Sequence, residues 1–163
     1  MRPAGLLSFG ETSGMAATSP NADYAGDITC TEAWELLKAD TGAQVVDVRT
    51  VAEWSYVGLP DLTALGRRVL TVEWHGFGTR TVNPDFVPQV HEALDAVGAG
   101  PETAVVFLCR SGVRSRLAAT AMTQAGFKRA YNVADGFEGD LDNEYHRGRR
   151  NGWKAAGLPW RQS

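Results

Sequence analysis

The sequence predicts one α/β domain with a largely parallel sheet covered on both faces by helices. The chain of 163 residues is 44% hydrophobic and 21% charged, which suits a single domain with its own core. Short apolar runs alternate along it with segments of helical periodicity. Such alternation is typical of βα units, and βα units build parallel sheets with both faces covered.

The helices are predicted from apolar stripes with the helical period and from residues that favour helix ends. The segments are 27–44, 83–100 and 115–127. In the first, Thr29 and Glu32 fit a capping box, whose side chains accept hydrogen bonds from free backbone N–H groups. In the second, Asn83 is the expected cap, with Pro84 at the first helical position. Gly126 ends the third helix at a position suited to a left-handed turn.

The strands are predicted from short apolar runs between turn signals. In chain order they are 44–48, 67–74, 103–108 and 129–134. Segment 49–62 is too irregular for a strand, so we expect a loop there with one helical turn at 51–55. A turn with a short helix is expected at 135–146. The irregular tail that follows has three apolar side chains that would pin it to the body: Trp153, Leu158 and Trp160.

Composition sets the domain limits and the expected setting. Residues 1–23 are predicted to be a disordered N-terminal segment because 8–21 are rich in Gly, Ser and Thr, and the domain is predicted to run from 24 to 161. A net charge of -3 does not suggest nucleic-acid binding, and no apolar run has membrane-spanning length. Two cysteines cannot build a disulfide framework. A reducing, cytoplasmic setting is therefore predicted, where a thiol stays reactive.

The stretch LCRSGVRS carries the chemistry, because the most apolar strand stops there at Cys109. Ligands gather at the carboxyl ends of strands in open α/β sheets. The helix that follows offers free N–H groups and partial positive charge, which favour a thiolate. Arg110 and Arg114 act in the same direction, and Gly112 lets the loop curl into an anion-binding nest. A cysteine that only fills space needs no such loop. The stretch predicts a sulfur nucleophile beside an anion cradle.

This loop resembles the active-site loop of single-domain rhodaneses, the thiosulfate-type sulfurtransferases. Four further segments resemble that family in the same order: DITCTEAWELL, VVDVRTVAEWSYVGLP, YNVADGFEG and NGWKAAGLPW. Together they cover nearly everything from Asp27 to Trp160. The resemblance implies a three-layer fold with a central, mainly parallel, five-stranded sheet. The segment VGLPDL departs from the family pattern because it lacks a histidine.

The resemblance also implies roles for particular residues. Cys109 would be the nucleophile of a thiosulfate:cyanide type of sulfurtransferase. It would take a sulfane sulfur from thiosulfate or a related persulfide donor and pass it to a thiophilic acceptor. The loop residues would hold the persulfide and the donor's oxyanion: Arg110, Ser111, Gly112, Val113, Arg114 and Ser115. The guanidinium of Arg114 would bind the anion. Asp47 would order the loop region and Arg49 would border the pocket; the alternative is a structural ion pair.

Other functions stay open at this point. The chain could be a persulfide carrier that passes sulfur to a partner protein, or a sulfur-sensing module with little turnover. A rhodanese-like phosphatase or arsenate reductase would need a longer loop, Cys-x5-Arg, whereas Arg114 follows Cys109 in a Cys-x4-Arg spacing. Cys30, in the first turn of a helix, is interpreted as a structural thiol; resolving a persulfide is the alternative.

The expected partners are small molecules. We expect an anionic sulfur donor and a thiol or cyanide acceptor, or a sulfur-accepting protein, and neither nucleic acid nor a membrane. No cofactor or metal is expected, because the three histidines lie far apart and none has ligand spacing: His75, His91 and His146. The loop that contains Trp74, His75, Phe77 and Arg80 would either wall one side of the active site or lie free on the surface.

Overall fold

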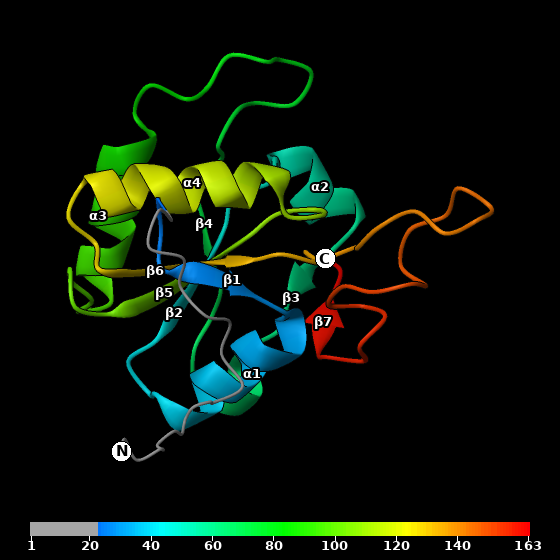
Figure 1. Ribbon diagram of the computed structural model, residues 1–163, viewed down its shortest axis with the longest axis horizontal. Coiled ribbons are helices and arrows are strands. Elements are labelled where there is room, and N and C mark those ends of the chain that lie inside the picture. The colour runs from blue at the N-terminus through cyan, green and yellow to red at the C-terminus, as the bar shows by residue number, and fades with distance from the viewer. Residues whose placement is uncertain (1–22) are drawn as a thin grey trace, which may run out of the picture.

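The computed structural model describes residues 23–163 as a five-stranded sheet between two helical layers (Figure 1). The strands lie in the order β1-β6-β5-β2-β4, and every pairing within this sheet is parallel. The predicted fold class, α/β with a parallel five-stranded sheet, is confirmed. The predicted N-terminal segment, 1–23, lies outside the described residues except for its last member.

The main sheet is built from five short strands: β1 (Gly26–Ile28), β2 (Gln44–Asp47), β4 (Leu70–Thr71), β5 (Ala104–Leu108) and β6 (Arg129–Val133). A separate antiparallel pair joins β3 (Leu59–Pro60) to β7 (Trp160–Arg161). The helices are α1 (Cys30–Ala39), α2 (Val51–Tyr56), α3 (Phe86–Ala96) and α4 (Val113–Gln124), with a 3-10 turn η1 (Thr63–Leu65). Among the described helices, none is long and apolar enough to cross a membrane.

The central strand β5 divides the core into two layers. All five of its residues are buried. Val105 and Phe107 pack with buried residues of α3 and α4, whereas Val106 and Leu108 pack with those of α1. Burying one such side chain contributes about 1.5–3 kcal/mol. A strand that is apolar throughout therefore lies in the middle of the sheet, where helices cover both faces.

Several element predictions are wrong in detail. Residues 26–28 form edge strand β1 ahead of the first helix, a segment too short and too polar for the strand pattern. Strand β4 spans only two residues of the predicted 67–74. The second long helix begins at Phe86, because Asn83 instead closes a turn in which its side chain accepts a hydrogen bond from the Asp85 N–H. The segment 135–146 contains turns and no helix.

The C-terminal tail is pinned to the body, as predicted. Trp153 is completely buried among the residues on the α1 side of the sheet. Its indole N–H donates to the Pro159 carbonyl at 2.7 Å, and the Lys154 ammonium donates to the Val57 carbonyl at 2.9 Å. The same ammonium lies 3.9 Å from the centre of the Trp160 ring. These contacts hold the tail against the segment that follows α2.

Candidate active site

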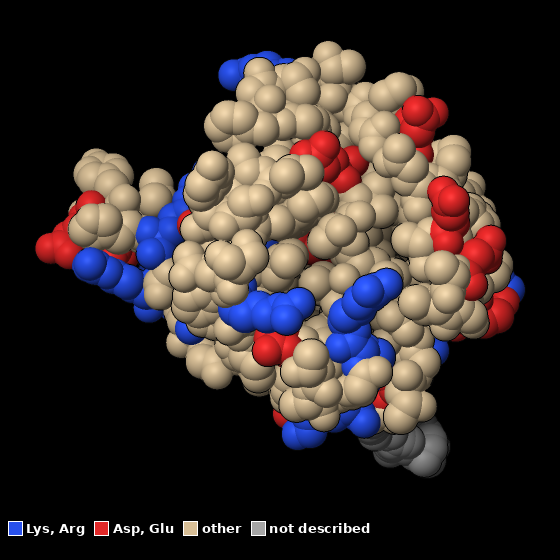
Figure 2. All heavy atoms as spheres, turned by 180° about the vertical axis from the view of Figure 1, so that it is seen from behind, with Lys and Arg blue, Asp and Glu red and all other residues tan. Residues whose placement is uncertain are grey.

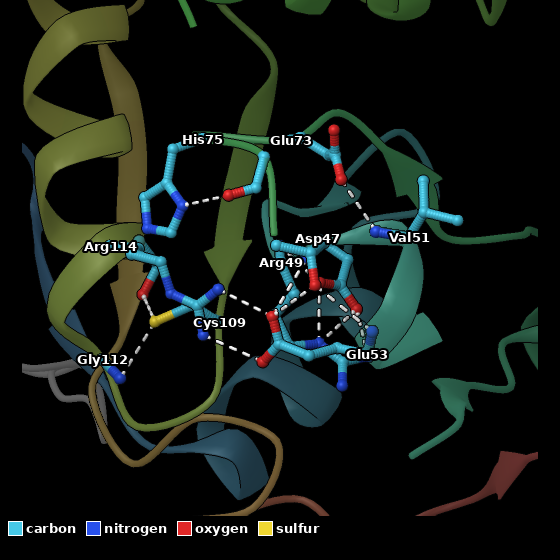
Figure 3. Close-up of polar contacts among 12 residues, drawn as sticks. Asp47, Arg49, Val51, Glu53, Glu73, His75, Cys109, Gly112 and Arg114 are labelled. Carbon is cyan, nitrogen blue, oxygen red and sulfur yellow. Dashed lines mark hydrogen bonds and ion pairs between the residues drawn. The ribbon is translucent and has the colours of Figure 1, made fainter. Parts of the chain in front are cut away.

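Cys109 lies at the carboxyl end of β5, four residues ahead of the first residue of α4. Its side chain is buried, with a relative exposure of 1%. The backbone N–H of Gly112 donates to Sγ at 3.1 Å (Figure 3), and Ser115 Oγ lies 3.2 Å from the same sulfur. The sequence-predicted nucleophile is therefore enclosed by its own loop.

The loop turns its first two carbonyls away from the sulfur. The Cys109 carbonyl accepts a hydrogen bond from the Phe137 N–H at 2.8 Å. The Arg110 carbonyl accepts from the N–H groups of Glu138 and Gly139 at 3.0 and 3.1 Å. The C=O and N–H of a trans peptide point in opposite directions. The N–H groups of Arg110 and Ser111 consequently face the inside of the loop.

Backbone N–H groups of this loop are available to a ligand. Within residues 23–163, no acceptor is found for the N–H groups of five residues: Arg110, Ser111, Val113, Arg114 and Ser115. The last three belong to the first turn of α4, where an α-helix leaves its N–H groups unpaired. Such a run of inward N–H groups, at the positive end of a helix dipole, is suited to binding an anion.

Two glycines permit the close packing that shapes the loop. Gly112 has a φ of 103°, and a Cβ there would collide with the Ala134 carbonyl oxygen. Gly136 has a φ of 70°, and a Cβ there would collide with the Arg110 carbonyl oxygen. The loop and the turn after β6 therefore approach each other more closely than any side chain would allow.

Arg114 makes a two-point ion pair with Glu53 of α2. Figure 3 shows the two contacts, whose distances are 2.8 and 2.9 Å. Both side chains are largely buried. Burial alone raises the pKa of Glu53, but Arg114 outweighs it, and with help from Thr50 the pKa falls to about 2. Burial lowers the pKa of Arg114, but Glu53 outweighs it, so the net shift is upward. An ion pair is thus fixed near the sulfur, with its Arg114 guanidinium close enough to interact electrostatically with Cys109.

Asp47 and Arg49 form a wholly buried ion pair. Two guanidinium nitrogens of Arg49 donate to the Asp47 carboxylate at 2.7–3.1 Å, and one of them also donates to the Gly58 carbonyl. The guanidinium carbon lies 4.3 Å from the centre of the Phe137 ring. The Arg49 side chain has no exposed surface in this structure, and its place at the border of a substrate pocket stays a prediction. The pair joins the end of β2 to the segment that holds the loop.

Sequence reasoning did not identify several residues of the site. Glu53 lies in one of the family segments, and Thr50 and Glu53 have the spacing of a capping box, which the structure contains. Asn132 is buried and reaches Ser115, and nothing in its local sequence marks it. Of the predicted loop side chains, Arg110 and Val113 are exposed, whereas Ser115 is buried.

Cys30 has a different environment. Its thiol is buried and donates to the Asp135 carboxylate at 3.2 Å. Burial and this hydrogen bond raise the pKa of the Cys30 thiol to about 12. Both cysteines are free of disulfides. A thiol that stays protonated at neutral pH is a poor nucleophile, so Cys30 has the properties of a structural residue.

The histidines do not gather into a metal centre within the described chain. His75 follows β4, with Nδ1 3.0 Å from the Gly76 carbonyl oxygen (Figure 3). His91 packs its ring against Phe127. Asp142, Glu144 and His146 could bring three ligand atoms within 4.8 Å of one another. Arg149 already pairs with both of those carboxylates.

Two hollows lie near β4, and Cys109 lines neither of them. Figure 2 views the molecule from behind and shows basic side chains near the middle of that face. One hollow is lined by Arg67, Arg68 and Arg161, among others, and the second includes Trp54 and Glu73. Arg67 donates to the carbonyls of Leu37, Asp40 and Ala43 at the end of α1. This arginine therefore has a structural role in capping a helix.

The chain is similar in sequence to several known proteins. Residues 25–163 match the family model described as the STR4 middle domain. An uncharacterized protein of Rickettsia conorii is 35% identical over 134 residues, which cover 82% of this chain and 95% of that protein. The rhodanese-like domain-containing protein 4 of Arabidopsis thaliana chloroplasts is 30% identical over 129 residues, 78% of this chain and 24% of that longer protein.

Two solved structures have a similar fold. The crystal structure of Rv0390 from M. tuberculosis is 51% identical, with a TM-score of 0.77, over 86% of this chain and 99% of that one. The polysulfide-sulfur transferase of Wolinella succinogenes, solved as a homodimer, is 22% identical, with a TM-score of 0.57. The match covers 88% of this chain and 82% of the Wolinella chain. At 22% identity, the match shows only that the two proteins share a fold.

The pKa of Glu53 leads to a prediction about acid stability. Its value in the folded protein, about 2, lies below the ordinary 4.5, so the ion pair stabilises the fold above about pH 4.5 and loses this effect as the pH falls through 2. The shift corresponds to about 3 kcal/mol at most. Glu53→Gln should therefore lower the free energy of unfolding at pH 7, and the gap from wild type should shrink below pH 4.

Urea denaturation at pH 7 and pH 3 measures this gap. Glu35→Gln is the matched control, because its ion pair with Lys38 is exposed and contributes less than about 1 kcal/mol. A Glu53→Gln gap of equal size at both pH values would show that the carboxylate charge does not carry the effect.

Proposed function

The chain belongs to the rhodanese-like family, in the group described as the STR4 middle domain, and from this premise we propose that it is a sulfurtransferase. It moves a sulfane sulfur from thiosulfate or a related persulfide donor to a thiol or cyanide, through a persulfide on Cys109. Both cysteines are free, which suits a reducing, cytoplasmic compartment. The reaction uses the side chain and backbone groups of the loop and requires no cofactor.

The environment of the Cys109 Sγ atom is the observation that carries the proposal. The sulfur lies 3.1 Å from the Gly112 N–H, and neighbouring N–H groups have no acceptor within the described residues. Each charge-assisted hydrogen bond contributes about 1.5–3 kcal/mol to holding an anion. A persulfide anion on Cys109 and the leaving oxyanion of the donor are both negatively charged, so the same cradle stabilises each of them.

The first half-reaction is a displacement at sulfur. The Cys109 thiolate attacks the outer sulfur of thiosulfate, a new S–S bond forms, and the old S–S bond breaks. The bonding electron pair leaves with sulfite, and Cys109 becomes a persulfide anion. In the second half-reaction, cyanide or a thiolate attacks the terminal sulfur and carries it away as thiocyanate or a new persulfide, and the Cys109 thiolate returns. Sulfur and electrons balance across the two steps.

Arg114 offsets the repulsion in the first step. Two unit charges about 4 Å apart repel by about 4 kcal/mol at an effective dielectric of 20, and thiosulfate carries two charges. Arg114 supplies a positive charge near the thiolate, and its ionised partner Glu53 balances that charge until the donor arrives. Glu53 already occupies the two terminal nitrogens of its guanidinium. The donor's oxyanion is therefore held chiefly by backbone N–H groups, while Arg114 acts through its charge or exchanges Glu53 for the donor.

A second candidate is a persulfide carrier that delivers sulfur to a protein. Large apolar side chains are exposed on the elements that carry the site: Val51 and Tyr56 on α2, and Val113 and Leu117 on α4. Exposed apolar residues around a site favour contact with a protein surface. The phosphatase alternative has no such support, because the loop keeps the Cys-x4-Arg spacing.

We predict that Cys109 is the residue that carries the sulfur. Intact-mass analysis after treatment with thiosulfate should show one added sulfur, which a thiol or cyanide then removes. The adduct should be absent in Cys109→Ser and should persist in Cys30→Ser, the matched control, because Cys30 is held as a thiol by burial and Asp135. Loss of the adduct in Cys30→Ser with retention in Cys109→Ser would refute the assignment.

The charge of Arg114 predicts a donor-dependent defect. Arg114→Ala should lower kcat/KM for thiosulfate roughly ten- to a thousand-fold, which corresponds to about 1.4–4 kcal/mol. Arg114→Lys should recover part of this, because a lysine restores charge without the two-point geometry. Steady-state kinetics with thiosulfate and with an uncharged sulfur donor separate charge from shape. Equal losses for both donors would mean that Arg114 only shapes the loop.

A further inference from the structure

A row of buried polar groups runs from Cys109 to the edge of the sheet. Ser115 Oγ lies 3.2 Å from Cys109 Sγ and donates to Asn132 Oδ1 at 2.6 Å. The Asn132 amide donates in turn to Asp27 Oδ1 at 2.9 Å. Cys109, Ser115 and Asn132 are all buried, with exposures of 1%, 0% and 3%. Buried polar groups in a connected row strongly affect one another, because water does not compete for them.

The direction of each hydrogen bond in this row is fixed from its outer end. A carboxylate only accepts, so Asn132 must present its NH₂ group to Asp27 and its carbonyl oxygen to Ser115. Tyr24 also donates to the same Asp27 oxygen, at 2.8 Å. The hydroxyl of Ser115 has a single proton, and the short contact with Asn132 takes it. Only lone pairs of Ser115 then face the sulfur of Cys109.

We propose that Ser115 and Asn132 are positioning residues that hold Cys109 as a thiol in the resting protein. In this state the S–H donates to Ser115. To form the thiolate, the thiol proton passes to water and the Ser115 hydroxyl turns from Asn132 to the sulfur, which leaves the Asn132 carbonyl without its donor. The proposal rests on the proposed function in one respect: the thiolate restrained in this way is the group that attacks the sulfur donor.

Charged groups near Cys109 favour either its thiol or its thiolate. None of these groups is replaced in the variants below. They include Arg114 on α4 with its partner Glu53 on α2, the ion pair of Asp47 and Arg49 after β2, the neighbouring Arg110, and Asp27 beyond Asn132. Burial and then the hydrogen bond to Asp27 raise the pKa of Tyr24 to about 12, so Tyr24 stays neutral from pH 5 to 10. A change that follows removal of Ser115 or Asn132 therefore reports on the row itself.

The test is the rate of Cys109 alkylation by iodoacetamide as a function of pH, followed on the Cys109 peptide by mass. Ser115→Ala and Asn132→Ala should each shift the profile to lower pH, by roughly half to one unit, the equivalent of one net hydrogen bond. The double variant should match Ser115→Ala alone, because Asn132 acts only through Ser115. Thr120→Ala is the control, since that hydroxyl lies on the same helix and bonds to the Arg116 carbonyl.

A shift of Ser115→Ala to higher pH would overturn the proposal, because it would mean that the hydroxyl donates to the thiolate. An unchanged profile in this variant would overturn it as well. Ser115→Ala removes one oxygen atom, so the sign can be read even if Asn132→Ala fails to fold. Alkylation needs no sulfur donor. A protein that shows the predicted shifts but takes up no sulfur would refute the proposed function and leave this proposal intact.

Discussion

The site depends on the hydrogen bonds between the Cys109 loop and the turn after β6. In them, the carbonyls of Cys109 and Arg110 accept from the N–H groups of residues 137–139. These bonds turn the loop's own N–H groups inward, because the two ends of a peptide group point opposite ways. They also require the two backbones to lie close together, which is possible only because Gly112 and Gly136 lack side chains. Without these hydrogen bonds, the backbone N–H groups that replace water around the buried sulfur would no longer face it.

Two ion pairs on the α2 side support the packing of the Cys109 loop against residues 137–139. The buried pair of Asp47 and Arg49 places a guanidinium over Phe137, the residue whose N–H holds Cys109. The pair of Glu53 and Arg114 ties α2 directly to the first turn of α4. Removing one member of a buried pair is costly because it leaves a charge without a partner. The positive charge near the sulfur is thus part of the fold and is in place before any ligand arrives.

The sequence predicted the α/β class, three of the four helices in the described part of the chain, and Cys109 at a strand end, because these follow from periodicity and from adjacent residues. It failed where long-range contacts decide. Strand β1 exists through its pairing with β6, and Asn132 reaches the site only because β6 lies beside β5. The partner of Arg114, Glu53, lies 61 positions away, and no local pattern joins the two. Register and pairing across the sheet are properties of the whole fold.

The central claim is that the loop around Cys109 cradles a negatively charged sulfur with its backbone N–H groups. A crystal structure of the protein treated with thiosulfate tests it most directly. The account predicts an extra sulfur bonded to Cys109 Sγ, within hydrogen-bonding distance of N–H groups of Arg110–Ser115, with Phe137 still bound to the Cys109 carbonyl. An extra sulfur on another residue, or one on Cys109 that contacts none of these N–H groups, would contradict it.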